Sequence, residues 1–566
     1  MPIESGTHLS RELRRLVTAG ALVLASTAAA QTPGIVRPEA IRAHVEYLAD
    51  DLLEGRGTGS RGHALAAAYV AAQFKQLGLS PAGDKNGDEA GFLQTVRLLE
   101  ATPVLPGSAA KWSASGTTTT FEYHADYLPF ADYSAPNSTL TAPLVFAGFG
   151  ITAPEAGYDD LASVDVRDRI AVVLSGAPAK FPHDQRAYYS WTGAKFENLI
   201  AHGALGVIIV DTPVDTERSP WERRVKMSWQ PQMRWLGSND QPVDAYPELK
   251  QQFRFNHAAA AKLFQNGTPT LEEVFATAET GEAQGFLLPG LMTLTSTTGL
   301  RRTESQNVIA VLRGTDPVLR RQFIVVSAHL DHLGRGAAVN GDAVYNGAHD
   351  NATGVGVLLE MARSIVASDS QPKRSIIFIA TTAEEKELLG AELFAHHPTV
   401  PKNAIVANVN INMPLFLGPT RDFVVVGGRH STLGPAAQRS VRAQGYAVSA
   451  DNAPEEVRLI RGDQFAFLKQ GIPAIHLSSG YQARVQGPDI AALRQEFFRD
   501  HYHQPSDDLS LPVHYPSAVD LVQIGARLVV DIANQAERPR FNRGDFFEAK
   551  FGVGTPSRPV AKRPSE

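Results

Sequence analysis

Histidines and carboxylates stand next to predicted strand ends and helix starts in the stretch Phe323–Glu360. This stretch reads F-I-V-V-S-A-H-L-D-H-L-G and, after a loop, G-A-H-D-N-A-T-G. The first block places His329, Asp331 and His332 in a polar loop directly after a buried strand. In the second block, Asp350 stands where an apolar helix begins. Imidazole and carboxylate groups in such positions are the ligands that a zinc-type metal ion requires.

Three later stretches carry side chains of the same kind. Glu384 and Glu385 close a hydrophobic strand pattern, so one carboxylate can bind a cation while its neighbour acts as a general base. Asn412 ends the strand A-N-V-N-I-N-M, and His503 lies in D-H-Y-H-Q-P-S-D. Each also has a plainer interpretation, because glutamates favour the first turn of a helix, asparagines form turns, and single histidines often lie in surface loops.

Strands and helices alternate from residue 306 onward. Strands are predicted at 307–312, 322–328, 375–381, 404–411, 422–427 and 472–477, and helices at 353–367, 388–395, 433–444, 463–470 and 516–534. Apolar, β-branched strands in this alternation predict an α/β domain whose central mixed sheet is largely parallel and has helices on both faces. The site of such a sheet lies at the carboxyl ends of its strands.

The domain organisation follows from changes of pattern along the chain. Residues 31–135 and 301–540 are predicted to form the N-terminal and catalytic parts of one domain. Residues 136–300 contain strand and helix patterns without a group of metal ligands, which predicts an inserted, β-rich α+β accessory domain. One large undivided domain is the alternative. Residues 541–566 are rich in Pro, Arg and Gly, so we expect a loose C-terminal tail.

The N-terminus has the pattern of an export signal. Three arginines precede the apolar run Leu16–Ala25, and a small-residue cleavage site ends at Ala30. This pattern predicts a signal peptide over residues 1–30 and an exported protein, periplasmic or secreted. An anchoring or core helix is the alternative, although the run is too short to span a bilayer. No later segment has about twenty consecutive apolar residues, so no stable membrane span is expected after signal removal.

Composition narrows the function classes further. A chain of 566 residues exceeds one ordinary core, so two or more domains are expected. The formal net charge of −6 offers no electrostatic reason to expect nucleic acid as a partner. Cysteine is absent, which excludes disulfides, cysteine nucleophiles and thiolate metal sites. Any metal ion must therefore be held by His, Asp, Glu or amide side chains.

The ordered motifs resemble a known family, the zinc-dependent aminopeptidases of metallopeptidase family twenty-eight. The resemblance rests on A-H-L-D-H-L-G, G-A-H-D-N-A-T-G, A-E-E-K-E-L-L-G-A and Y-H-Q-P-S-D, and it covers about 35–135 and 300–540. L-E-G-R-G-T-G-S also matches a segment that precedes the catalytic part in exported relatives. Region 136–300 resembles a protease-associated domain through A-G-F-G-I-T and Y-D-D-L-A-S-V-D-V-R-D-R-I-A-V-V-L.

The resemblance implies a site for two zinc ions. Asp350 matches the carboxylate that bridges them. His329 would belong to one zinc ion, and Glu385 and His503 to the other. The family has Asp where this chain has Asn412, which would complete the site of His329. An amide oxygen is neutral and a poorer zinc ligand than a carboxylate, so we expect weaker binding there, another metal, or a less demanding substrate.

The resemblance also implies catalytic roles. Glu384 would be the general base, which takes a proton from the attacking water and passes it to the leaving amine. Asp331 would not bind the metal itself but would orient the ligand His329. Tyr502 would donate a hydrogen bond to the tetrahedral oxyanion. Two cations would clamp the attacking water and the scissile carbonyl.

The function implied is that of an exported di-zinc aminopeptidase that removes N-terminal residues from peptides. A catalytically silent relative that serves as a binding module is one alternative, and Asn412 is its only support. A second alternative keeps the same site but uses it for carboxypeptidase or glutaminyl-cyclase chemistry.

Overall fold

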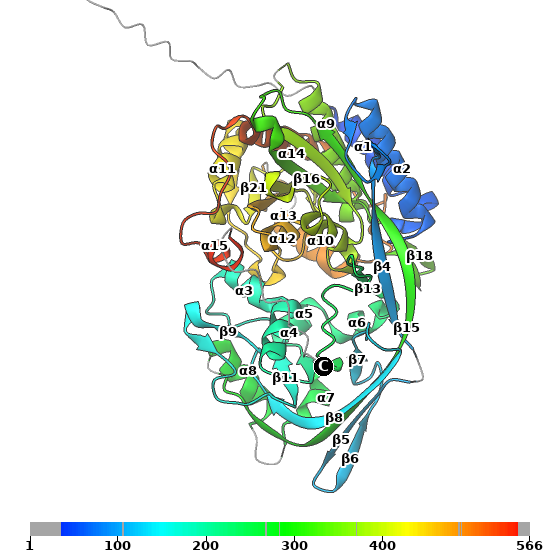
Figure 1. The fold of residues 1–566 in the computed structure, drawn as a ribbon, viewed down its shortest axis with the longest axis vertical. Coiled ribbons are helices and arrows are strands. Elements are labelled where there is room, and N and C mark those ends of the chain that lie inside the picture. The colour runs from blue at the N-terminus through cyan, green and yellow to red at the C-terminus, as the bar shows by residue number, and fades with distance from the viewer. Residues whose placement is uncertain are drawn as a thin grey trace, which may run out of the picture.

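The computed structural model describes residues 36–552 apart from 105–106, 266–268, 282, 370, 485–486 and 488. The predicted signal peptide over 1–30 therefore lies outside the described residues. Two units are visible in Figure 1, one around helices α9 and α14 and one around α4 and α8. Within the described part of the chain, no helix combines the length and apolar character needed to cross a bilayer.

The sheet of the main unit confirms the predicted α/β class. Its strands lie in the order β13 (Gln232–Trp235), β4 (Leu93–Pro103), β15 (Phe286–Leu312), β19 (Ser375–Thr381), β16 (Phe323–His329), β20 (Ile405–Asn410), β23 (Ala474–Ser479), β21 (Asp422–Val426) and β22 (Ala447–Ser449), and β1 (Ser80–Pro81) also pairs with β15. Strands β19, β16, β20 and β23 run parallel, whereas β15 and β21 run antiparallel to the neighbours β19 and β23. The sheet is therefore mixed with a parallel centre, as the sequence predicts.

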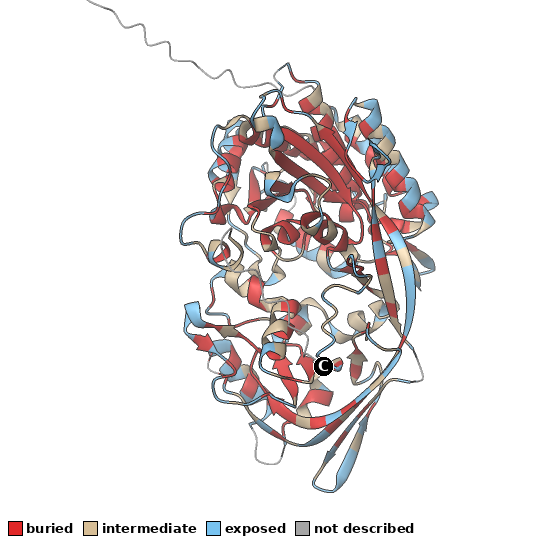
Figure 2. Cartoon of the chain, viewed as in Figure 1, coloured by how far each residue is buried: buried red, intermediate tan, exposed pale blue. Residues whose placement is uncertain are grey.

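Helices cover both faces of this sheet. One face carries α1 (Pro38–Leu48), α2 (Arg61–Gln76), α9 (Thr353–Val366), α11 (Leu433–Ala443) and α14 (Tyr515–Asn534), and the other carries α10 (Leu389–His396) and α12 (Gln464–Lys469). In β16, Ile324 and Val326 join the apolar core under α9, while Val325 joins the core on the opposite face. Because both faces are covered, the central strands are buried along their whole length (Figure 2).

The second unit is built on its own sheet. Its strands lie in the order β6 (Thr117–Phe121), β5 (Ala109–Ala114), β15, β8 (Asn137–Phe146), β11 (Ile170–Leu174), β12 (Gly206–Val210), β14 (Gln251–Phe255) and β7 (Tyr127–Pro129). Its helices are α3 (His183–Ser190), α4 (Thr192–Ala201), α5 (Pro213–Arg218), α6 (Trp221–Met227), α7 (His257–Ala261) and α8 (Leu271–Thr280). Strands β5, β6 and β7 precede residue 136, so this sheet includes residues outside the range expected for the insert.

Strand β15 belongs to both sheets. It is 27 residues long, whereas the sequence pattern predicts a strand only over 307–312. Its first part pairs with β8 and β5, and its last part pairs with β4 and β19 (Figure 1). The two units therefore share one continuous strand at this connection instead of a linker.

The start of the expected C-terminal tail is ordered. Helix α15 (Phe546–Phe551) begins after Asp545, which caps it, and the side chain of Phe547 is fully buried. Phe546 makes an edge contact with Tyr188 of α3, so α15 packs against the second unit. The expectation of a loose tail is therefore wrong for these residues, because aromatic side chains give the short helix apolar contacts. Residues 553–566 lie outside the described residues.

A buried histidine connects these same parts. His430 Nε2 lies 2.6 Å from Asp184 Oδ2 on α3, and its Nδ1 lies 2.8 Å from Asp545 Oδ2. Arg429 Nε also contacts Asp184 Oδ2, at 2.8 Å. Burial opposes the charged form of His430, but hydrogen bonds to Asp184 and Asp545 outweigh it and raise the pKa of the imidazole. His430 therefore links the second unit and α15 to the main unit through two carboxylates.

We expect the stability contributed by His430 to depend on pH. Its folded pKa is raised above the unfolded value of about 6.5, so the stabilisation is complete below that pH and is lost as the pH rises through the folded pKa. Hydrogen bonds to charged groups contribute about 1.5–3 kcal/mol each. His430→Gln should therefore lower the melting temperature more at about pH 6 than at about pH 9. The exposed His202→Gln is the matched control, and an equal loss at both pH values would contradict the prediction.

Candidate metal centre

The predicted site residues meet at the carboxyl edge of the parallel strands. His329 ends β16, Glu384 and Glu385 follow β19, Asn412 follows β20, Asp350 lies in the turn before α9, and His503 follows α13 (Ile490–Glu496). Parallel strands that end at one edge bring together residues far apart in the sequence. All six side chains predicted to bind metal or act as base are therefore in one place.

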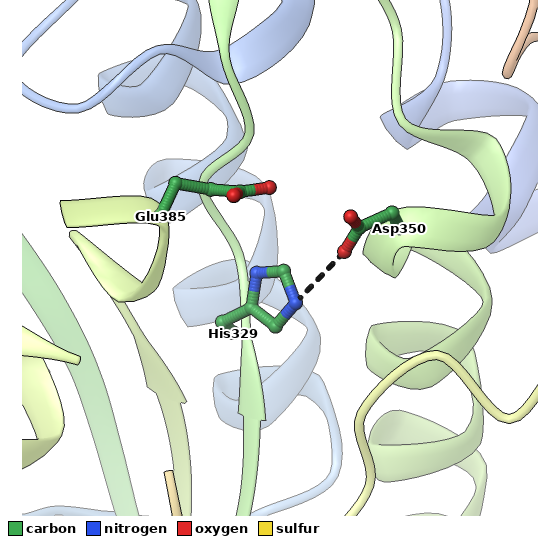
Figure 3. A group of neighbouring side chains, drawn as sticks. All are labelled: His329, Asp350 and Glu385. Carbon is green, nitrogen blue, oxygen red and sulfur yellow. Dashed lines mark ion pairs between the residues drawn. The ribbon is translucent and has the colours of Figure 1, made fainter. Parts of the chain in front are cut away.

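Asp350 lies between the two histidines. Its Oδ1 is 3.2 Å from His329 Nε2, and its Oδ2 is 3.3 Å from His503 Nε2. Glu385 Oε2 lies 3.1 Å from the same nitrogen of His503. Figure 3 shows Asp350 and Glu385 approaching His329 from different segments of the chain, and one ligand atom from each of the three lies within 4.8 Å of the others. The two oxygens of Asp350 thus face two separate groups of ligand atoms.

The donor set fits a divalent metal ion of the zinc type. His503 Nε2 is buried and makes no hydrogen bond, although two carboxylate oxygens lie within 3.3 Å of it. Atoms that converge without hydrogen-bond geometry are what a shared cation between them requires. Nitrogen and oxygen ligands suit zinc among several metals, and thiolates are absent from this chain.

Asn412 faces both His329 and Glu384. Its Oδ1 lies 3.0 Å from His329 Nε2, on the side where Asp350 Oδ1 also approaches that nitrogen. Its Nδ2 donates a hydrogen bond of 2.8 Å to Glu384 Oε1. The amide can therefore offer an oxygen to a cation beside His329 while it holds the side chain of Glu384. A carboxylate at this position could not donate the second bond.

Comparison with known proteins places the residues of this edge in a family. The sequence model of peptidase family M28 matches residues 307–526. Residues 307–526 belong to peptidase family M28. The matched range contains every residue of the site described above and is named the M28 region below.

Curated relatives match only part of the chain. A vacuolar membrane protease of Yarrowia lipolytica is 33% identical over 95 residues, which are 17% of this chain and 9% of that protein. A vacuolar membrane protease of Candida glabrata is 33% identical over 97 residues, again 17% of this chain and 9% of that protein. The aligned part therefore spans about a tenth of the length of these relatives.

Solved structures match nearly the whole chain in fold. The aminopeptidase from Aneurinibacillus sp. strain AM-1 is 19% identical, covers 89% of this chain and 95% of its own, and superposes with a TM-score of 0.50. The zinc aminopeptidase BSAP from Bacillus subtilis is 16% identical, covers 89% and 97% of the two chains, and has a TM-score of 0.42. The first of these shows that the two chains share a fold.

Asp331 positions the glutamate pair of the M28 region. Its Oδ1 accepts a hydrogen bond of 3.1 Å from the backbone N–H of Glu384, and its Oδ2 accepts one of 3.1 Å from the hydroxyl of Thr58. The contact with His329 comes from the backbone carbonyl of Asp331, 3.1 Å from Nδ1, and not from the carboxylate. Asp331 therefore holds both His329 and the turn that carries Glu384.

Two further buried residues fix the loops that carry the candidate metal ligands. The sequence analysis does not predict a role for either of them. Arg56 donates to the carbonyls of Leu330 at 2.9 Å and Gly347 at 3.0 Å, and so ties together the loops before Asp331 and Asp350. Asp507 accepts the backbone N–H of Asp350 at 3.1 Å. Both lie in motifs that carry the family resemblance, L-E-G-R-G-T-G-S and Y-H-Q-P-S-D, which was the only signal for them.

His332 also belongs to the centre of the M28 region. Its Nδ1 lies 2.6 Å from Glu385 Oε1, while its Nε2 is buried without a partner. Its ring packs edge-on against His503, with 5.7 Å between the ring centroids. The sequence places His332 in the metal-binding loop but indicates no role for it; the structure shows that it orients Glu385.

Tyr502 lies between two arginines. Arg461 of the M28 region donates a 2.9 Å hydrogen bond to its hydroxyl, and Arg223 of α6 lies over its ring at 5.3 Å. Arg223 also donates to the carbonyl of Phe498 at 3.0 Å and to the carbonyl of Tyr502. The second unit therefore contacts the loop that presents His503, a contact that no sequence motif indicates.

The environments of Glu384 and Glu385 push their pKa values apart. Burial raises the pKa of Glu384 well above its ordinary range, and the neighbouring Glu385 raises it further. Burial also acts on Glu385, but His503 and His332 outweigh it and lower the pKa of that carboxyl. Adjacent carboxyls with opposite shifts are typical of a division between a proton-transferring group and a permanently charged one.

Proposed function

We propose that the protein is an exported di-zinc aminopeptidase. The observation that carries this proposal is the position of Asp350, whose two oxygens face His329 and His503 separately. One ion would be held by His329, Asp350 and Asn412. The other would be held by Asp350, Glu385 and His503. Membership of residues 307–526 in peptidase family M28 supports peptide-bond hydrolysis as the reaction.

The chain's own residues account for proton transfer. Two zinc ions, when bound, would supply a Lewis acid for the scissile carbonyl and lower the pKa of the attacking water. Glu384, which Asn412 holds by a 2.8 Å hydrogen bond, takes the proton of that water and delivers it to the leaving amine. The hydroxyl of Tyr502, held by Arg461, is the donor for the developing oxyanion.

The space beside the centre supports peptide ends as substrates. A cavity of about 480 Å³ reaches from Glu384 and Glu385 to Trp191 and Arg218 of the second unit. Its walls come from both units, and its volume leaves room beside the centre for a short chain terminus. This arrangement favours removal of terminal residues over cleavage within a folded chain.

Metal removal combined with substrate blocking tests the proposal. Dialysis against a chelator should abolish hydrolysis of aminoacyl 4-nitroanilides, and added Zn²⁺ should restore it. N-acetylated versions of the same anilides should not be hydrolysed, because an aminopeptidase requires a free α-amine. Hydrolysis of the acetylated anilides would show that a free α-amine is not required and would contradict an aminopeptidase, and the absence of any chelator-sensitive hydrolysis would favour a silent binding module.

A further inference from the structure

A small cavity adjoins the metal centre on the side of Asn412. Its volume is about 60 Å³, several times the roughly 10–15 Å³ that one water molecule requires. Asp350, Glu384 and Asn412 of the centre line it together with Arg458, Arg494 and the neutral His476. The ion pair of Arg461 and Glu456 also lies in its lining. A substrate held at the centre would therefore extend a neighbouring group toward these arginines.

Arg494 is buried without a carboxylate partner. Its side chain comes from α13, and the residue is only 5% exposed. Its Nη1 donates a long hydrogen bond of 3.4 Å to the hydroxyl of Ser479. Among the described residues, no carboxylate lies within ion-pair distance of it. A buried, unpaired charge is costly, so this arrangement is suited to an anion that arrives from outside.

Arg458 brings a second guanidinium to the same place. Its Nε and Nη2 contact Asp451 at 3.1 Å and 2.5 Å, while its Nη1 is buried and has no hydrogen-bond partner. The guanidiniums of Arg494 and Arg458 lie 4.8 Å and 5.6 Å from the ring centre of Tyr481. Burial and repulsion from Arg458 lower the pKa of Arg494 to about 10.

Two carboxylates lie close to these arginines, but neither forms an ion pair with Arg494. Asp451 neutralises one of the two arginines. Asp422, the other carboxylate close to Arg494, accepts the backbone N–H of Gln482 at 2.9 Å and so holds a turn. His476 adds a buried Nε2 that also has no partner. The lining therefore contains one guanidinium, that of Arg494, without a carboxylate at ion-pair distance among the described residues, and one buried donor nitrogen, Nη1 of Arg458, without a partner.

We propose that Arg494 and Arg458 bind a carboxylate group of the substrate next to the scissile bond. Arginine is the side chain best suited to this, because its planar guanidinium matches a carboxylate with two parallel hydrogen bonds. The carboxylate is either the side chain of an acidic N-terminal residue or the terminal carboxylate of a very short peptide. This inference rests on the proposed peptidase function and adds the substrate class.

Paired substrates that differ by one charge test the proposal. Glutamyl 4-nitroanilide is compared with glutaminyl 4-nitroanilide, and alanyl-alanine with its C-terminal amide. The acidic member of one pair should be favoured roughly 10- to 100-fold in kcat/KM, the range expected for hydrogen bonds to a charged group. A preference in the first pair identifies the side chain as the source, and one in the second pair identifies the chain terminus.

Variants of Arg494 test whether this residue causes the preference for the acidic substrate. Arg494→Gln should remove the preference, mainly through a higher KM for the acidic substrate, while the neutral substrate is hydrolysed as before. Arg494→Lys, which keeps the charge, should retain part of it. Arg442→Gln, an exposed change on α11, is the matched control. Melting curves identify any variant that fails to fold, in which case Arg494→Lys carries the test.

A binding measurement separates this proposal from the proposed function. Calorimetric titration of the purified protein with glutarate should show binding that Arg494→Gln weakens at least tenfold. If no substrate is hydrolysed but glutarate binding depends on Arg494, the peptidase function fails and the anion site stands. If substrates are hydrolysed without a preference in either pair, or if Arg494→Gln keeps the preference, the anion site is overturned and the peptidase function stands.

Discussion

Glu384→Gln should lower kcat for aminoacyl 4-nitroanilides by about 10²- to 10⁴-fold, the usual contribution of a general base. Glutamine keeps the size of the side chain and can still contact Asn412, but it cannot accept a proton from water. Because Glu385, and not Glu384, contacts His503 and His332, the variant should keep its metal content. KM should change little, since the change removes a proton transfer and not a binding contact.

Steady-state kinetics and metal analysis on the same preparation decide this prediction. Glu272→Gln, an exposed substitution at the start of α8, makes the same chemical change away from the centre and should leave kcat unchanged. If Glu384→Gln keeps full activity, another group transfers the proton. If it loses metal together with activity, Glu384 is a ligand and not a base.

The central sheet could be predicted from the sequence because its strands are apolar on both faces. The sequence predicts a strand over 375–381, and the structure has a strand at Ser375–Thr381. Likewise, 322–328 corresponds to Phe323–His329. Continuous apolar runs of this length, followed by polar residues, mark both the strand and the end where its functional side chains lie. The convergence of His329, Asp350 and Glu385 then follows from the parallel topology.

Long-range polar contacts could not be predicted in this way. Arg56 contacts carbonyls 274 and 291 residues further along the chain, and no periodicity links such positions. The pair Arg458 and Arg494 is brought together by folding around Tyr481, although neither arginine lies in a recognisable motif. Strand β15 exceeds its predicted length because its Thr-rich, polar first part pairs with the second sheet. Tertiary pairing, and not local composition, decides such segments.

Asn412→Asp should strengthen metal binding and weaken turnover at the same time. A carboxylate beside His329 Nε2 adds a negative charge to the ligand group that now has a neutral amide. We expect the more weakly held ion to bind roughly 10- to 100-fold more tightly, the range usual for changes around a metal site. The same substitution removes the N–H that Asn412 donates to Glu384 and places two carboxylates 2.8 Å apart. The base is then less well positioned, so kcat should fall.

Metal content after exhaustive dialysis and competition with a chelator measure the first effect, and steady-state kinetics at saturating Zn²⁺ measure the second. Asn340→Asp makes the same change in an exposed turn and should alter neither quantity. Two tightly held zinc ions in both the wild type and Asn412→Asp would show that the amide is an adequate ligand. A rise in both affinity and kcat would show that the hydrogen bond to Glu384 does not position the base, and that the neutral amide alone limits the activity of this centre.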